Sequence, residues 1–247
     1  EQSPYIQWVV GIFMLLFGVN FNIYYLLLLR RFTTAIKSRE LWAYLAIVGV
    51  ATVLVAVSIW EQYETAGDVI RHAFFQVSSI ITTTGYATAD FNLWSGFAKV
   101  VLLLLMFVGA CAGSTGGGLK VSRVMLLFKA VRRDLTQHLH PRSVGVIKLE
   151  GKRVDDATVS SVGVYLALYF ILLFAAFLIL SLERFDIETN FSAVAACLNN
   201  IGPGRSGGKL CRLFRPVEAG ALRGDAVRAA GDLPAAVRAH PVRLDAE

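Results

Sequence analysis

Charged side chains are scarce in this sequence of 247 residues. Asp, Glu, Lys and Arg together make up 17% of the chain, whereas hydrophobic residues make up 55%. A typical soluble domain carries about 25% charged residues. Because the mean hydropathy is also high, at +0.58, the composition excludes an ordinary soluble globular domain and indicates a membrane protein.

Cysteine and histidine are also rare, which limits the chemistry that the chain can perform. The three cysteines, Cys111, Cys197 and Cys211, have no metal-ligand spacing and predict no disulfide. The four histidines form no grouping with a nucleophile and an acid. We therefore expect no metal centre, no cofactor and no enzyme activity.

Long apolar segments are abundant by contrast. A helix that spans a membrane needs about 20 mostly apolar residues. Four segments meet this requirement, at about residues 6–29, 43–60, 93–112 and 161–182. The sequence thus predicts an all-α membrane protein with about four spans.

The charges between these spans alternate in sign along the chain. Loop 30–40 holds four basic residues against the single acid Glu40, and loop 120–156 holds nine basic residues. Segments 61–72 and 183–192 carry mostly acids. Because basic loops stay in the cytoplasm, the two basic loops are expected on that side. The net charge of +6 therefore reflects membrane topology, and we expect no nucleic-acid partner.

Two shorter apolar segments lie at about 68–81 and 187–198, and each precedes a glycine-containing turn. Neither can cross a bilayer, so both are predicted to be re-entrant half-helices that enter from the outer side. Together with the spans before them they form two similar units. Each half-helix would point its C-terminal end, with its partial negative charge, toward the bilayer centre. This arrangement favours a cation path over an anion site.

The first of these turns, Thr83-Thr84-Gly85-Tyr86, is similar to the Thr-Val-Gly-Tyr-Gly loops whose carbonyls select potassium in channels. Gly85 permits the backbone angles that let successive carbonyls face one axis. A Thr-rich outer loop is the alternative. A membrane enzyme with a Ser/Thr site at 78–84 is disfavoured, because no base lies beside the nucleophile.

Five glycines fall within residues 109–118. Each costs a helix about 1 kcal/mol relative to alanine, so the third span should break there and resume at about Val121. The loop predicts a gate beneath the turn at 83–86, and a close helix crossing through small residues is the alternative. The spacing GxxxxG within it also fits a nucleotide-binding loop, but Leu119 stands where that motif requires lysine.

Three of these stretches resemble the Trk/Ktr/HKT family of potassium-uptake transporters, and TrkH in particular. Residues 81–91 resemble the third filter region of the family, and residues 109–120 resemble the broken helix that holds its intramembrane gating loop. Residues 196–204 resemble a later filter stretch, as do shorter matches at 140–142 and 151–154. The likeness runs from about residue 5 to residue 204.

The resemblance implies four helix–pore-helix–helix repeats around one pore, of which this chain carries part. Residues 1–42 would be the last helix of the second repeat and a cytoplasmic loop. Residues 43–131 would be the third repeat, 132–160 a cytoplasmic loop, and 161–204 a partial fourth repeat. Residues 205–247 form an atypical tail rich in Arg, Ala and Gly.

The resemblance also implies which residues handle potassium. K⁺ would bind to carbonyls of the filter, formed by Thr83, Thr84, Gly85, Tyr86, Asn200, Ile201, Gly202, Pro203 and Gly204. The gate loop would comprise Gly113, Ser114, Thr115, Gly116, Gly117, Gly118 and Lys120. Gly85 favours K⁺ over Na⁺ by resemblance, and the choice between the two ions otherwise stays open.

The same likeness implies the surroundings of the protein. It would be a multi-pass protein of the bacterial inner membrane, in contact with lipid. A cytoplasmic nucleotide-binding subunit similar to TrkA or KtrA would regulate it, and the full-length form would be a homodimer. K⁺ would be the transported ion, and no cofactor is expected.

The sequence changes character after Gly204, where the family pattern requires another membrane helix. Residues 205–247 contain seven arginines and no Ile, Tyr, Trp, Asn, Thr, Gln or Met. A frameshift near the Gly204 codon is the favoured interpretation, and a basic disordered tail is the alternative. Potassium uptake is therefore the leading hypothesis, and a non-conducting truncated or frameshifted fragment is its alternative.

Overall fold

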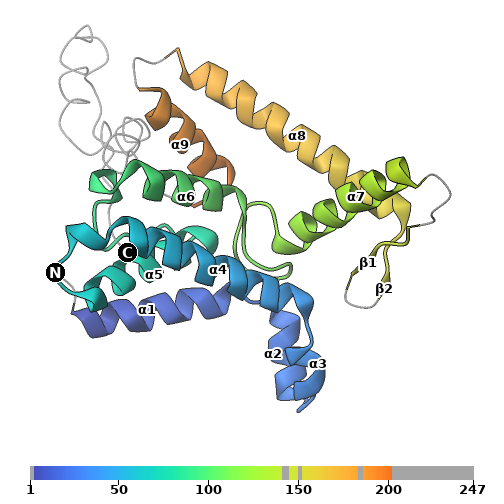
Figure 1. The fold of residues 1–247 in the computed structure, drawn as a ribbon, viewed down its shortest axis with the longest axis horizontal. Coiled ribbons are helices and arrows are strands. Elements are labelled where there is room, and N and C mark those ends of the chain that lie inside the picture. Colours follow the sequence, from blue (N-terminus) through green and yellow to red (C-terminus); the bar gives the residue numbers. More distant parts are fainter. Residues whose placement is uncertain (1–2, 141–144, 150–151, 183–185, 202–247) are drawn as a thin grey trace, which may run out of the picture. The chain divides into compact units, whose positions relative to one another are not determined.

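A computed structural model of the chain describes residues 3–140, 145–149, 152–182 and 186–201. Most of these residues are helical (Figure 1), which confirms the predicted fold class. The helices are α1 (Pro4–Phe17), α2 (Phe21–Leu28), α3 (Phe32–Ile36), α4 (Arg39–Ser58), α5 (Ala66–Ile81), α6 (Gly96–Phe107), α7 (Val121–Leu139), α8 (Asp156–Leu180) and α9 (Ile187–Leu198). Smaller elements are the 3-10 helices η1 (Trp60–Gln62) and η2 (Phe91–Leu93) and the antiparallel pair β1 (Lys148–Leu149) and β2 (Lys152–Arg153).

Helices α4 and α8 are long and apolar enough to cross a membrane, with 20 and 25 residues. Both begin before the first residue of the predicted apolar run. Ser38 caps α4 by accepting a hydrogen bond from the Leu41 N–H (3.4 Å), and Asp155 occupies the N-cap position of α8. For α4 the capping hydrogen bond of Ser38, and not the first apolar residue, thus marks where the helix starts.

The first predicted span, at about residues 6–29, is not one continuous helix but a bent pair of helices. Helices α1 and α2 meet at an angle of 91°. Gly18 ends α1, and Asn20 begins α2 by accepting a hydrogen bond from the Asn22 N–H (2.9 Å). A Cβ atom on Gly18 would lie 2.2 Å from the hydroxyl of Tyr44, which donates to the Leu15 carbonyl (3.0 Å). Close packing against α4 therefore fixes the bend.

Within the third predicted span, 93–112, helix α6 ends at Phe107, just before the break predicted at 109–118, and α7 begins at Val121 as predicted. Helix α6 has 12 residues, a length of about 18 Å, which is too short to cross a bilayer. The chain leaves the helix at Val108, before the first glycine of the loop, because Val108 pairs with Leu119 in an isolated parallel bridge. The described part of the chain holds two continuous helices of spanning length, or three spans with the bent α1–α2 pair, instead of the predicted four.

The two short helices α5 and α9 match the predicted half-helices at 68–81 and 187–198. Helix α5 packs against α1, α4 and α6, and α9 packs against α8 and α6. Every residue from Phe75 to Ile81 is buried. Each helix therefore ends among other parts of the chain, where polar backbone can find partners.

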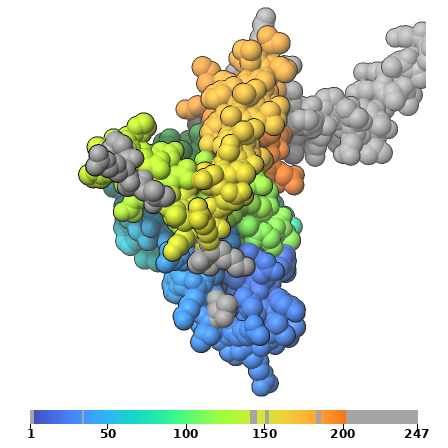
Figure 2. Space-filling model, turned by 90° about the vertical axis from the view of Figure 1, so that its right-hand side faces the viewer, coloured from blue at the N-terminus to red at the C-terminus, as the bar shows by residue number. Residues whose placement is uncertain are grey.

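Helix α8 lies along one face of the molecule and is coloured yellow to orange in Figure 2. Only 11% of its most apolar window is buried. The large apolar side chains of Val164, Ile171 and Leu178 are more than half exposed. A helix that exposes this much apolar surface is suited to contact lipid.

We predict that Gly18→Ala destabilises the protein, because the new methyl group would collide with the Tyr44 hydroxyl. Overpacking of this kind costs about 1–3 kcal/mol. Gly49→Ala in α4 is the matched control, since no atom lies within 4 Å of a Cβ there. Thermal unfolding in detergent measures both variants. Equal melting temperatures for the two would contradict this account of the bend.

Candidate functional site

Helix α5 ends in a turn that passes through a left-handed residue. Thr82 is the C-cap, and Thr83 follows it with a φ of 56°. The Thr83 N–H donates to the Ile80 carbonyl (3.0 Å), and the Thr84 N–H donates to the Ser79 carbonyl (2.9 Å). This pair of hydrogen bonds defines a Schellman motif, which ends a helix and redirects the chain.

Helix α9 ends in the same way. Asn199 is the C-cap, and Asn200 follows it with a φ of 55°. The Asn200 N–H donates to the Cys197 carbonyl (3.1 Å), and the Ile201 N–H donates to the Ala196 carbonyl (2.9 Å). Both turns therefore share one backbone pattern, although their sequences differ.

The side chains at the two C-caps play matching roles. The Thr82 hydroxyl donates to the Ser78 carbonyl (2.6 Å), and the Asn199 amide donates to the Ala195 carbonyl (2.8 Å). Each bond reaches back four residues into its own helix. The side-chain oxygen Oδ1 of Asn199 also accepts a hydrogen bond from the Tyr169 hydroxyl of α8 (2.8 Å). The two half-helix ends are thus structural counterparts, as the two similar sequence units predict.

Thr83 is an unusual residue for a left-handed position, which glycine or asparagine normally occupies. The conformation costs a residue with a Cβ atom about 1–2 kcal/mol. In return, the Thr83 hydroxyl accepts a hydrogen bond from the Gly117 N–H (2.7 Å). Strain of this kind persists where the surrounding structure fixes it, often at functional sites.

Beyond this turn the chain stays non-helical through the predicted filter residues. Gly85 has a φ of 78°, the left-handed geometry for which glycine was predicted. The Tyr86 carbonyl accepts from the Ser79 hydroxyl (2.6 Å), and the hydroxyls of Thr82 and Thr84 lie 2.9 Å apart. Hydroxyl groups of α5 and its C-cap therefore hold the segment that follows it.

The glycine-rich loop between α6 and α7 packs against both turns. Besides the bond from Gly117 to Thr83, a Cβ atom on Gly117 would lie only 2.3 Å from the Asn199 carbonyl oxygen. Gly118 has a φ of 69° and lies beside the Asn199 side chain. The absence of side chains lets the loop approach both helix ends at once. The predicted gate residues thus contact predicted filter residues of the first turn and the C-cap of the second.

Lys120 closes the far end of this loop. Its ammonium group donates to the Gly116 carbonyl and lies 3.4 Å from the Ser114 hydroxyl. The side chain is half-buried, and its positive charge lies among oxygen atoms of the loop. At its other end the loop docks on the α1–α2 bend, where the Cys111 N–H donates to the Gly18 carbonyl (3.0 Å).

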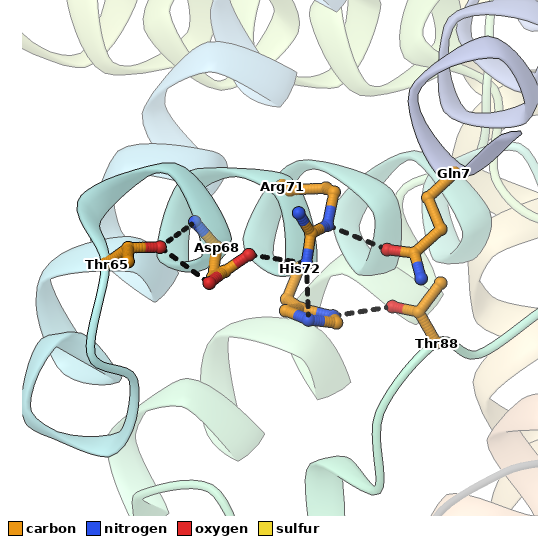
Figure 3. Close-up of polar contacts among 6 residues, drawn as sticks. All are labelled: Gln7, Thr65, Asp68, Arg71, His72 and Thr88. Atoms are coloured by element: carbon orange, nitrogen blue, oxygen red, sulfur yellow. Dashed lines mark hydrogen bonds and ion pairs between the residues drawn. The ribbon is translucent and has the colours of Figure 1, made fainter. Parts of the chain in front are cut away.

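A polar network surrounds the N-terminal half of α5 (Figure 3). Arg71 forms a salt bridge with Asp68 (2.6 Å) and donates to the Gln7 amide oxygen (2.9 Å). The Nδ1 atom of His72 lies 2.9 Å from the Thr88 hydroxyl. Because Thr88 follows the predicted filter segment, this contact ties the far end of that segment to α5.

Two pKa shifts follow from this network. A hydrogen bond from Thr65, helped by the nearby Arg71, lowers the pKa of the Asp68 carboxyl. Burial, and then the charge of Arg71, lower the pKa of His72. The lowered pKa favours the neutral form of the His72 ring.

The chemistry of the site is that of neutral oxygen atoms. Among the described residues, no group of three His, Cys, Asp or Glu side chains could hold a metal ion. The two turns present carbonyls, threonine hydroxyls and asparagine amides at helix C-termini, which carry partial negative charge. Such ligands suit an alkali cation that binds and leaves quickly.

The structure describes most of the residues that the sequence singles out. Thr83, Thr84, Gly85 and Tyr86 follow α5, and residues 200–201 follow α9. The remaining predicted filter residues, Gly202, Pro203 and Gly204, lie outside the described residues. All predicted gate residues lie in the loop between α6 and α7.

Several contributing residues were not predicted from the sequence. They are Ser79, Thr82, Asn199, His72 and Glu40, which is buried beneath the glycine-rich loop. An alignment of the two half-helix sequences at their C-terminal ends would have identified Thr82 and Asn199 as equivalent polar residues. Glu40 stood out only as the single acid in a basic loop.

We predict opposite effects for two substitutions of Thr83. Thr83→Val leaves the half-buried Gly117 N–H without its acceptor, and an unsatisfied buried donor costs about 1–3 kcal/mol at most. Thr83→Ser keeps the acceptor and removes the β-branch, so it should be neutral or slightly stabilising. Thermal unfolding in detergent compares them. If Val were tolerated as well as Ser, the bond to Gly117 would not hold the turn.

We also predict that His72 makes stability depend on pH. Because its pKa is lowered by folding, the unfolded chain binds the proton more readily, and stability falls as the pH drops below about 6.5. His72→Asn keeps a polar atom near Thr88 but cannot titrate. Melting temperatures between pH 5 and 8 should therefore fall less in this variant. Asp68 does not contribute in this window, since its lowered pKa acts only in stronger acid.

A sequence model of the TrkH family, described as a cation transport protein, matches residues 1–219. The chain is 35% identical over 205 residues to the potassium uptake protein TrkH of Escherichia coli K12, covering 82% of this chain and 42% of that protein. It is 37% identical over 204 residues to TrkG of the same organism, covering 81% and 41%.

A solved structure gives the same result. The crystal structure of the potassium transporter TrkH from Vibrio parahaemolyticus superposes with a TM-score of 0.74 and 33% identity, covering 83% of this chain and 45% of that one. These relatives are named as potassium transporters and not as enzymes. The chain spans about two fifths of the length of the curated relatives that it matches. The match over most of its residues shows that this chain belongs to the TrkH family of cation transport proteins.

Proposed function

We propose that this chain supplies two filter segments and the gate loop of a potassium uptake pathway. One observation carries the proposal above the others. Two half-helices end in the same Schellman turn, and one glycine-rich loop packs against both ends. This arrangement concentrates neutral oxygen atoms where two helix dipoles present negative ends, and it covers them with backbone that has few side chains.

The filter residues act by replacing water around the ion. Carbonyls of Thr83, Thr84, Gly85 and Tyr86 coordinate dehydrated K⁺ from one side, and those of residues 200–204 coordinate it from another. Neutral oxygen ligands hold the ion weakly enough to release it, as conduction requires. K⁺ is the cargo here, and the proposal involves no cofactor.

The loop formed by residues 113–118 and Lys120 acts as the gate. In the described position it lies directly against Thr83 and Asn199, and the Lys120 ammonium adds a positive charge beside it. Opening would break the bond from Gly117 to Thr83 and move that charge away. Because the loop has almost no side chains to repack, such a movement requires few other changes.

The proposed setting follows the family. The protein would lie in the bacterial inner membrane, with α8 facing lipid. A nucleotide-binding subunit similar to TrkA or KtrA would dock on the cytoplasmic loops, and the full-length protein would be a homodimer. A second candidate is that this chain alone does not conduct, because two filter turns surround only part of an axis.

The first test is growth rescue of a potassium-uptake-deficient bacterium at low K⁺. We expect a full-length transporter that contains this segment to restore growth, with K⁺ uptake that excess Na⁺ does not inhibit. The chain as it stands should not restore growth alone. Rescue by the chain alone would contradict the second candidate, and failure of the full-length protein would contradict the proposed function.

The gate makes a sharper prediction. Gly117→Ala in the full-length transporter should change the K⁺ uptake rate about tenfold, because its Cβ atom would collide with the Asn199 carbonyl and overpacking costs about 1–3 kcal/mol. Gly163→Ala in α8 is the control, since no atom lies within 4 Å of a Cβ there. Equal uptake by the two variants, at equal expression, would remove the loop from the ion path.

A further inference from the structure

Glu40 is buried at the point where the basic loop 30–40 enters α4. It lies in the first turn of the helix, after the N-cap Ser38, and its side chain is 5% exposed. An acidic residue at this position normally faces solvent and interacts with the helix dipole. Glutamate is rarely buried without a partner that requires it.

The partners of Glu40 come from two distant segments. Its Oε1 atom accepts a hydrogen bond from the Ala112 N–H (2.6 Å) in the glycine-rich loop. Its Oε2 atom lies 3.5 Å from the Asn20 side-chain amide at the α1–α2 bend. A single carboxyl group thus joins the start of α4, the bend and the loop.

The contact with Ala112 lies at the centre of the loop's docking site. On one side the Cys111 N–H donates to the Gly18 carbonyl (3.0 Å), and on the other the Gly113 carbonyl accepts from the Phe21 N–H (3.3 Å). Those two bonds join neutral backbone groups. The bond to Glu40 is shorter and involves an ionisable acceptor, and such charge-assisted bonds are roughly twice as strong as neutral ones.

Opposite charges hold the two ends of the loop. Glu40 accepts from a backbone N–H at Ala112, and Lys120 donates to the backbone carbonyl of Gly116. Gly117 and Gly118, which approach the two helix ends, lie between Ala112 and Lys120 in the chain. Removal of one anchor should therefore release one end of the loop without touching either filter turn.

We propose that Glu40 is a positioning residue that latches the glycine-rich loop and couples the cytoplasmic loop 30–40 to the ion path. The coupling rests on the proposed function of the loop as a gate, whereas the latch itself does not. Glu40 is both the last residue of loop 30–40 and the second residue of α4. A partner that shifts this first turn would withdraw the carboxyl group from Ala112 and free the loop.

Cys111 provides a natural reporter of the latch, because its thiol is fully buried and it precedes Ala112. In a Cys197→Ser, Cys211→Ser background, the rate of Cys111 modification by N-ethylmaleimide measures how often the loop leaves its site. Glu40→Ala should raise this rate about tenfold or more, as expected for loss of a hydrogen bond to a charged group. Glu40→Gln keeps an acceptor oxygen and should restore most of the protection.

Two further variants guard against simple misfolding. Asn20→Asp still caps α2, since aspartate is as good an N-cap as asparagine, but it places a second carboxyl group beside Glu40. It should also accelerate modification of Cys111. Glu61→Ala, at the opposite end of the same span and exposed, should leave the rate unchanged. Unchanged Cys111 modification in Glu40→Ala and Asn20→Asp would overturn the latch.

Uptake by the full-length transporter separates the latch from the gate. Glu40→Ala should raise the maximal K⁺ uptake rate several-fold and leave the KM for K⁺ unchanged, because the filter turns are untouched. Glu40→Gln should restore the normal rate. A changed KM would overturn the positioning role. Faster Cys111 modification with unaltered uptake would support the latch and overturn the proposed gate.

Discussion

A helix that ends in a packed interior leaves its last carbonyls and the following N–H groups without water, and this constraint governs the arrangement of the described helices. The Schellman turns after α5 and α9 satisfy part of that demand with bonds inside each turn. The glycine-rich loop then lies against both ends, and Gly117 donates the one bond that links it to Thr83. The surrounding helices position these three pieces of non-helical backbone, and the exposed apolar face of α8 is what remains for lipid.

The two helix ends show how a backbone constraint can persist when side chains change. Thr82 and Asn199 share neither shape nor charge distribution, yet each returns a hydrogen bond to the carbonyl four residues earlier. At the next position both turns have a left-handed residue, Thr83 or Asn200. This conformation is sterically less favourable for threonine than for asparagine. Of the two left-handed residues, Thr83 is the strained one, and it is also the one whose hydroxyl accepts the hydrogen bond from Gly117. The repeated unit therefore conserves hydrogen-bond geometry more closely than residue type.

Local features of the sequence could be predicted, and contacts between distant residues could not. The bounds of α5 and α9 followed from short apolar runs, and the glycines located the break after α6. The bend between α1 and α2 was missed because hydropathy averages over a window and ignores a single Gly18 that accommodates Tyr44. The third helix ends at Phe107, just before the first glycine, where Val108 pairs with Leu119. Glu40 meets Ala112, 72 residues away, and no pattern in one sequence reports such a pair.

A gate built from backbone has an energetic advantage over one built from side chains. Each neutral hydrogen bond that holds the loop contributes only about 1 kcal/mol net, so the resting position is defined by several weak contacts and two charged anchors. A regulatory partner typically supplies a coupling free energy of about 1–3 kcal/mol. This free energy is enough to break one anchoring hydrogen bond, whereas repacking a core would require more. An ion path controlled from the cytoplasm therefore benefits from a glycine-rich loop with one ionisable contact at each end. In this chain those contacts are Glu40 and Lys120, and each lies at the edge of a basic loop that is predicted to face the cytoplasm, where such a partner could act.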